Sequence, residues 1–164
     1  MRYLTTPWRM KYVISTAHYK GCVFCDLLAE EASDAEGFIL RRGTHGFLVL
    51  NIYPYTPGHL MAVPYRHVAS IAELEAHEVT ELLTFCQLGE GALRRVYGCR
   101  SVHGGANLGR VAGAGVPGHL HFHVVAWPAG QLWQRWATAE EPPETLEETY
   151  ASLTAALSEI EAEA

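Results

Sequence analysis

The sequence lacks the features that direct a chain to a membrane or to nucleic acid. No apolar run in its 164 residues approaches the length of a membrane span. The N-terminus shows neither the apolar stretch nor the small-residue cleavage site of a secretory signal. Lysine and arginine number 12 against 18 aspartates and glutamates, and the net charge of −6 disfavours broad attraction to nucleic acid. We therefore expect a cytoplasmic protein with a small-molecule ligand and no membrane or nucleic-acid partner.

Cysteine is also scarce, with four in the chain. Cys86 and Cys99 lie in or near an apolar helical stretch and have the character of small core residues. Cys22 and Cys25 form a Cys-x-x-Cys pair, which in a reducing cytoplasm indicates thiols rather than a disulfide framework. Such a pair supplies half of a tetrahedral zinc site. A small core pair and a redox dithiol are the alternatives, although the redox interpretation lacks a thioredoxin-like βαβ context.

Three histidines alternate with apolar residues in the segment Gly-His-Leu-His-Phe-His-Val-Val at 118–125. Because strand side chains alternate between faces, His119, His121 and His123 should point to one side and the apolar residues between them to the other. Imidazole has the unperturbed pKa nearest to neutral pH, so it can serve there as a nucleophile, a proton carrier or a metal ligand. A single histidine on a strand is usually structural, but three at period two on an apolar strand indicate function.

The hydrophobic patterning predicts one α+β domain in which antiparallel strands and helices are segregated. A short helix is expected at 22–32, and a long one from a capping box at Ser70 to about Tyr97. A last amphipathic helix carries Leu146, Tyr150, Leu153, Leu157 and Ile160 at spacings of four and three. Strands are expected at 38–42, 46–52, 59–63, 100–108 and 119–126. The single domain of 1–164 would consist of an arm at 1–20, a core at about 20–128, and an irregular segment with the last helix at 127–164.

Several sequence blocks together resemble one family. His-Leu-His-Phe-His-Val-Val matches the pattern His-φ-His-φ-His-φ-φ, with φ apolar, of the histidine triad (HIT) family. The block LVLNIYPYTPGHLMAVPYRHV at 48–68 resembles that family's preceding strand pair, and NLGRVAGAGVPGHLHFHVV at 107–125 resembles its phosphate loop and catalytic strand. PWRMKYV at 7–13 and GCVFCDLLAE at 21–30 are similar to bacterial members related to diadenosine tetraphosphate hydrolases and phosphorylases. The resemblance covers about 7–128.

The resemblance implies an α+β nucleotide-binding fold with a five-stranded antiparallel sheet, usually a homodimer, with the helix at 70–97 as its contact. It also implies attack on the α-phosphate of a dinucleoside polyphosphate. His121 would be the nucleophile that forms a nucleotidyl-imidazole, and His123 would assist the leaving group. His59 would hold a non-bridging oxygen, and Asn107 would orient the site. Water, phosphate or another acceptor would then take the nucleotide.

A substrate pocket follows from the same resemblance. An asparagine or aspartate eight residues before His59 bonds the ribose in the family, and two apolar residues contact the base. The glycine-rich loop at 109–115 can present backbone N–H groups to phosphate oxygens, and its arginine is either a phosphate ligand or a solvated loop residue. The expected substrate-binding residues are Asn51, Phe24, Ile52, Arg110, Gly113 and Gly115.

Zinc-bearing members of the family complete the cysteine pair with two histidines, which here correspond to His67 and His119. Cys22, Cys25, His67 and His119 would then form a closed site for a structural zinc, and no organic cofactor is expected. After Val125 the chain departs from the family's close diadenosine-phosphate relatives, which leaves the acceptor and the natural substrate open. A nucleoside phosphoramidase or acyl-adenylate hydrolase, a non-catalytic nucleotide-binding protein, and a cupin-like metalloenzyme are the alternatives.

Overall fold

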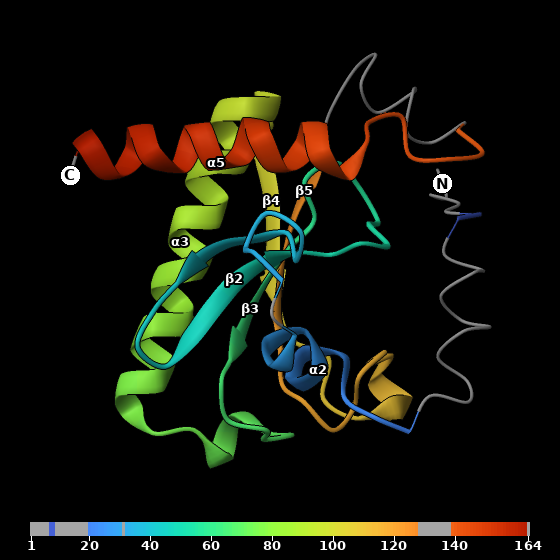
Figure 1. The fold of residues 1–164 in the computed structure, drawn as a ribbon, viewed down its shortest axis with the longest axis vertical. Helices are drawn as coiled ribbons and strands as arrows, with labels where there is room; N and C mark the ends of the chain where they lie inside the picture. Colours follow the sequence, from blue (N-terminus) through green and yellow to red (C-terminus); the bar gives the residue numbers. More distant parts are fainter. Residues whose placement is uncertain (1–6, 9–19, 31, 128–138, 164) are drawn as a thin grey trace.

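A computed structural model describes residues 7–8, 20–30, 32–127 and 139–163. Five antiparallel strands form one sheet in the order β1-β2-β3-β5-β4 (Figure 1). The strands are β1 (Ile39–Arg42), β2 (Gly46–Leu50), β3 (Leu60–Pro64), β4 (Ser101–Gly105) and β5 (Phe122–Trp127). The helices in this part of the chain are α2 (Val23–Ala29), α3 (Ala76–Tyr97) and α5 (Leu146–Glu163), with the short 3-10 turns η1 (Ile71–Glu73) and η2 (Arg110–Ala112). The expected α+β class and five-stranded sheet are confirmed.

Both faces of the sheet are covered, because the side chains of the inner strand β2 alternate between two cores. Leu48 and Leu50 belong to the larger core, which includes buried residues of α3 and α5. Phe47 and Val49 lie in the smaller core together with Phe24 of α2. All five residues of β2 are therefore buried. Figure 1 shows α3 along one side of the sheet and α2 on the other.

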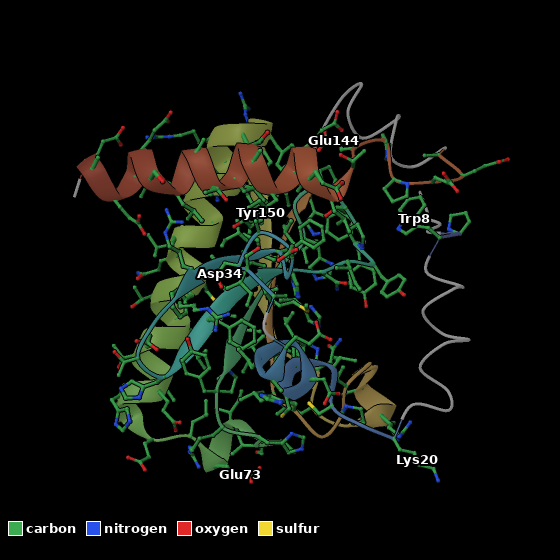
Figure 2. All side chains as sticks on the ribbon, viewed as in Figure 1. Trp8, Lys20, Asp34, Glu73, Glu144 and Tyr150 are labelled. Atoms are coloured by element: carbon green, nitrogen blue, oxygen red, sulfur yellow. The ribbon has the colours of Figure 1, made fainter. Side chains whose placement is uncertain are left out.

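The C-terminal helix α5 lies across one end of α3 (Figure 1). Its residues Leu153 and Leu157 are buried in the larger core, as the predicted apolar stripe requires. The hydroxyl of Tyr150, labelled beneath α5 in Figure 2, donates to the backbone carbonyl of Ile39 in β1 at 3.2 Å. The helix α5 is therefore anchored to both α3 and the edge strand β1 of the sheet.

The long helix begins later than predicted. Ser70 does act as a cap, but its hydroxyl accepts from the Ala72 N–H at 3.2 Å and closes only the 3-10 turn η1. Leu74 then adopts an extended conformation, with ψ of 145°. A second capping box, between Glu75 and Glu78, starts α3.

The histidine strand and its neighbour are also shorter than predicted. The ladder of β5 begins at Phe122 rather than His119, because the N–H of Leu120 donates to the carbonyl of Val68 at 2.6 Å and not to a strand. The fourth strand ends at Gly105. Most of the predicted N-terminal arm and residues 128–138 of the irregular segment lie outside the described residues. No helix in the described ranges is long and apolar enough to cross a membrane.

Candidate functional site

The histidine of β5, His123, faces the side of the sheet that carries α2. Phe122 and Val124 pack in the larger core under α3, so His123 between them points to the opposite face. On that face His123 lies opposite Met61 of β3. The predicted alternation of histidines and core residues is confirmed for the part of the segment that forms the ladder. It brings His123 to the end of β3, next to His59.

A cavity of about 490 Å³ opens on this face of the sheet. Its walls come mainly from apolar side chains of α2, β2, β3 and the turn after β2. Six of the predicted site residues line it: Phe24, Asn51, Ile52, Gly115, His121 and His123. A volume of this size with few polar groups suits a small organic ligand.

His121 is held in one tautomer by the main chain. Its Nδ1 lies 2.9 Å from the carbonyl oxygen of His119. A carbonyl can only accept, so Nδ1 carries the proton and Nε2 carries the lone pair. His121 is only 4% exposed, and burial lowers its pKa, against a smaller upward effect of the His119 carbonyl. The ring is therefore neutral at pH 7 and presents a nucleophilic nitrogen.

His59 and His123 form a second hydrogen-bonded unit. The Nε2 of His59 lies 2.9 Å from Nδ1 of His123. The backbone N–H of Tyr55 donates to Nδ1 of His59 at 3.2 Å, which places the proton of neutral His59 on Nε2. His59 then donates to Nδ1 of His123, so neutral His123 carries its own proton on Nε2. His121 and His123 thus adopt opposite tautomers, one with a lone pair on Nε2 and the other with an N–H there.

Two contacts of His59 were missed by the sequence analysis. The ring of Tyr55 stacks on the ring of His59, with centroids 4.8 Å apart and planes at 24°, and Tyr55 also lines the cavity. The side-chain nitrogen of Asn51 lies 3.3 Å from Nδ1 of His59. The only sequence signal for either contact is the turn Pro54–Gly58, which returns the chain so that residues before and after it meet.

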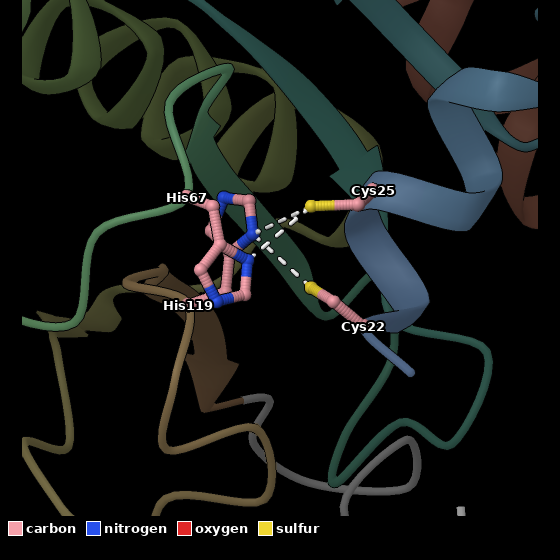
Figure 3. Close-up of side chains that lie close together, drawn as sticks. All are labelled: Cys22, Cys25, His67 and His119. Atoms are coloured by element: carbon pink, nitrogen blue, oxygen red, sulfur yellow. Dashed lines mark hydrogen bonds between the residues drawn. The ribbon is translucent and has the colours of Figure 1, made fainter. Parts of the chain in front are cut away.

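Cys22, Cys25, His67 and His119 converge as expected (Figure 3), with one ligand atom of each within 4.8 Å of the others. The Nε2–H of His119 donates to the carbonyl of Pro64 at 2.9 Å, which leaves the lone pair on Nδ1. This Nδ1 lies 3.2 Å from Sγ of Cys22 and 3.6 Å from Sγ of Cys25, and Nδ1 of His67 lies 3.3 Å from Sγ of Cys25. Ligands of a tetrahedral zinc lie about 3.5 Å apart for a nitrogen and a sulfur, so the four residues fit such an ion.

Three predicted substrate or catalytic residues, Asn107, Arg110 and Gly113, are not among the residues that line the cavity. Asn107 is half-buried, and a Cβ added to Gly113 would lie 3.9 Å from its Nδ2. Arg110 is exposed in η2, between Gly109 and Gly113, which both have positive φ. Their expected contacts with substrate stay predictions.

The fold and these contacts define a small α+β protein with a histidine-lined cavity beside a Cys/His cluster. The family model for the HIT domain matches residues 33–128, and the chain belongs to this family. Over 130 residues the chain is 37% identical to a Mycobacterium tuberculosis protein named AP-4-A phosphorylase, an alignment that covers 74% of this chain and 66% of that protein. Over 76 residues it is 30% identical to an asymmetrical bis(5'-nucleosyl)-tetraphosphatase of Schizosaccharomyces pombe, covering 46% of this chain and 41% of that one.

The chain thus spans less than two thirds of the length of either relative. Among solved structures, a zinc-bound histidine triad family protein from Mycobacterium smegmatis has a TM-score of 0.72 at 23% identity. That comparison covers 88% of this chain and 98% of the other. It shows that the two proteins share a fold.

Proposed function

We propose that the protein transfers a nucleotidyl group from a dinucleoside polyphosphate, such as diadenosine tetraphosphate, through a covalent intermediate on His121. The observation that carries the proposal is the buried, neutral imidazole of His121, whose protonated Nδ1 is tied to a carbonyl while the ring lines the cavity. The names of the two relatives, a phosphorylase and a tetraphosphatase, support this substrate class.

The reaction would proceed in two displacements. In the first, Nε2 of His121 attacks the α-phosphorus, a phosphorus–nitrogen bond forms, and the bond to the bridging oxygen breaks, so that ATP departs from diadenosine tetraphosphate. The Nδ1–H bond to the His119 carbonyl stabilises the cationic ring that results. The Nε2–H of His123 donates to a phosphate oxygen as negative charge develops. In the second, an acceptor oxygen attacks phosphorus and the phosphorus–nitrogen bond breaks, which restores His121.

The lining residues support a pose for the substrate. Phe24 and Ile52 would contact the base, because both line the apolar part of the cavity. Asn51 would reach the ribose, and the main chain at Gly115 would approach the phosphates. His59 is buried behind His123 and would act on phosphate through it.

Product analysis separates the two acceptors. The protein is incubated with diadenosine tetraphosphate with and without inorganic phosphate. ADP plus ATP that forms only with phosphate indicates phosphorolysis, which the more similar relative favours. AMP plus ATP indicates hydrolysis. Consumption of a nucleoside phosphoramidate or an acyl-adenylate alone would change the substrate class, and binding of all these nucleotides without turnover would favour the non-catalytic alternative.

The nucleophile is tested by substitution. His121→Ala should lower turnover by on the order of 10⁴-fold or more, because the covalent route is lost, while nucleotide still binds. The matched control is His103→Ala, since His103 is exposed on β4 and does not line the cavity. Mass spectrometry during steady-state turnover should detect a nucleotide adduct at His121. Full activity of His121→Ala would refute the proposal.

We also propose that Cys22, Cys25, His67 and His119 hold a structural zinc ion. Four protein ligands would close its coordination sphere, so the ion would join α2 to the loop before β5 rather than contact substrate. Metal analysis should find about one zinc ion per chain in the intact protein and none in Cys22→Ala. Cys86→Ala, which replaces a cysteine of α3, should retain the ion. A zinc content unchanged by Cys22→Ala would contradict the assignment.

We also propose that the protein forms a homodimer in a reducing cytoplasm. Strand β4 lies at the edge of the sheet, and a groove of about 460 Å³ runs between it and α3. Leu83 lines this groove and is 49% exposed, which favours a second copy of the chain as its partner. Light scattering should give twice the mass of one chain, and Leu83→Arg should shift the protein to a monomer. The reducing compartment would keep the thiols available as ligands.

A further inference from the structure

The side-chain amide of Asn51 is oriented by the backbone of the following turn. Its Oδ1 accepts from the N–H of Tyr53 at 2.9 Å. A backbone N–H can only donate, so the oxygen of the amide must face Tyr53 and the nitrogen must face the other way. That nitrogen lies 3.3 Å from Nδ1 of His59. The network therefore fixes which end of the amide meets the imidazole.

Two donors then converge on one nitrogen of His59. The Nδ2–H of Asn51 and the backbone N–H of Tyr55 both point to Nδ1. A hydrogen on Nδ1 would point at these two N–H groups, so the two contacts favour the form of His59 in which Nδ1 is unprotonated. These two hydrogen bonds therefore run in the same direction, from Asn51 to His59 and from His59 to His123, and in the proposed complex His123 would donate in turn to substrate.

From this network we infer that Asn51 is a positioning residue that sets the tautomers of His59 and His123, in addition to its place beside the ribose. The inference rests on the proposed function only in naming what His123 donates to. An amide at this position supplies a donor to His59, which a carboxylate cannot do. The amide of Asn51 thereby acts together with the Tyr55 N–H to hold His59 in the tautomer that donates to His123.

Asn51→Asp is the most informative change, because it is nearly isosteric and keeps two oxygens that can accept from ribose hydroxyls. One oxygen would still accept from Tyr53, but the other would meet the lone pair of Nδ1 on His59. Carboxylates have far lower ordinary pKa values than imidazole, so the proton of the new pair belongs on His59. Nδ1 of His59 should therefore become protonated in the variant.

The test is long-range ¹H–¹⁵N NMR of the ligand-free protein at neutral pH, which distinguishes protonated from unprotonated ring nitrogens. Signals of His59 and His123 are assigned from the spectra that lose them in His59→Gln and His123→Gln. In the unmodified chain we expect Nδ1 of His59 to be unprotonated and Nε2 to be protonated. In Asn51→Asp we expect the Nδ1 signal to move to the position of a protonated nitrogen.

Ile52→Asp is the matched control, because it places the same charge on the next lining residue of the cavity, on a side chain that is 52% exposed. The spectrum of this variant should show that Nδ1 of His59 remains unprotonated. The inference fails if Nδ1 of His59 is protonated in the unmodified chain, if Asn51→Asp leaves it unprotonated, or if both aspartate variants protonate it equally. The measurement uses no substrate, so a failure to find an adduct at His121 would not affect the inference about Asn51.

Discussion

The turn that delivers His59 to the site depends on a glycine that tolerates no side chain. Gly58 has φ of +63°, where L-residues are disfavoured. A Cβ at this position would lie 2.6 Å from Cδ2 of Leu93 and 2.6 Å from Cε2 of Tyr97, both on α3. Leu93 is fully buried and cannot move aside freely. We therefore expect Gly58→Ala to destabilise the protein and to displace His59.

The expected loss in the free energy of unfolding has two separable contributions. Placing alanine in the left-handed region costs about 1–2 kcal/mol. Forcing a methyl group into a filled core costs about 1–3 kcal/mol. The free energy of unfolding should thus fall by roughly 2–5 kcal/mol, which is a large part of the stability of an ordinary domain. Turnover of the proposed substrate should fall as well, because His59 follows directly in the chain.

Two other glycines separate these parts. Gly98 ends α3 with φ of +58°, but a Cβ there would meet no atom within 4 Å. Gly98→Ala should therefore show the conformational cost alone, about 1–2 kcal/mol. Gly104 lies in β4, without a positive φ and with open space around its Cβ position. Because Gly104 also lines the groove proposed for a second copy of the chain, the three variants are compared in the monomeric Leu83→Arg background. In that background Gly104→Ala should leave stability unchanged or raise it by up to about 1 kcal/mol.

Urea unfolding followed by fluorescence gives all three values on one scale. The expected order of destabilisation is Gly58→Ala, then Gly98→Ala, then Gly104→Ala. A midpoint for Gly58→Ala equal to that of Gly98→Ala would mean that the contacts with Leu93 and Tyr97 carry no strain. Such a result would refute the steric part of the reasoning.

Two further predictions concern buried polar contacts. Trp8→Phe keeps an aromatic ring but removes the Nε1–H that donates to the buried carbonyl of Pro54 at 2.8 Å. The substitution should lower the free energy of unfolding by about 1–2 kcal/mol in the same urea assay. An unchanged midpoint would show that water replaces the bond. Hydrogen bonds from the Arg66 guanidinium and from a backbone N–H lower the pKa of Glu78 to about 2. The contribution of the Glu78 carboxylate to stability is therefore present above the ordinary pKa near 4.5 and is lost as the pH falls towards 2. Glu78→Gln should flatten the stability profile in that acid range, and an equally steep profile in the variant would contradict this assignment.

The local patterns of the sequence predicted the parts of the fold that depend on near neighbours. The period-two histidines placed His123 on the correct face, and the spacing of apolar residues predicted α5 with Leu153 and Leu157 inside. The five-stranded antiparallel sheet and the convergence of the Cys/His cluster agree with the family resemblance, which supplied the two histidines that the cysteine spacing alone could not identify.

The features that the sequence did not predict depend on partners distant in the chain. β5 begins at Phe122 because the Leu120 N–H bonds to Val68, some fifty residues earlier, and no local propensity encodes that bond. The tautomers of His59 and His123 follow from hydrogen bonds across a turn and between two strands, so they emerge only when the turn is folded. Asn51 was assigned to the ribose by the family resemblance, and a resemblance in sequence does not reveal which end of an amide faces an imidazole.

His119 contributes to two neighbouring sites, to one through its imidazole ring and to the other through its main-chain carbonyl. Its ring lies next to Cys22 and Cys25, whereas its main-chain carbonyl accepts a hydrogen bond from the Nδ1–H of His121. Every amino acid has a carbonyl at this place, so exchanging the ring for another side chain would remove a ligand of the proposed zinc ion and still leave the acceptor for His121. Descendants of such a chain could therefore gain or discard the ion over evolutionary time while the chemistry of the neighbouring imidazole persists.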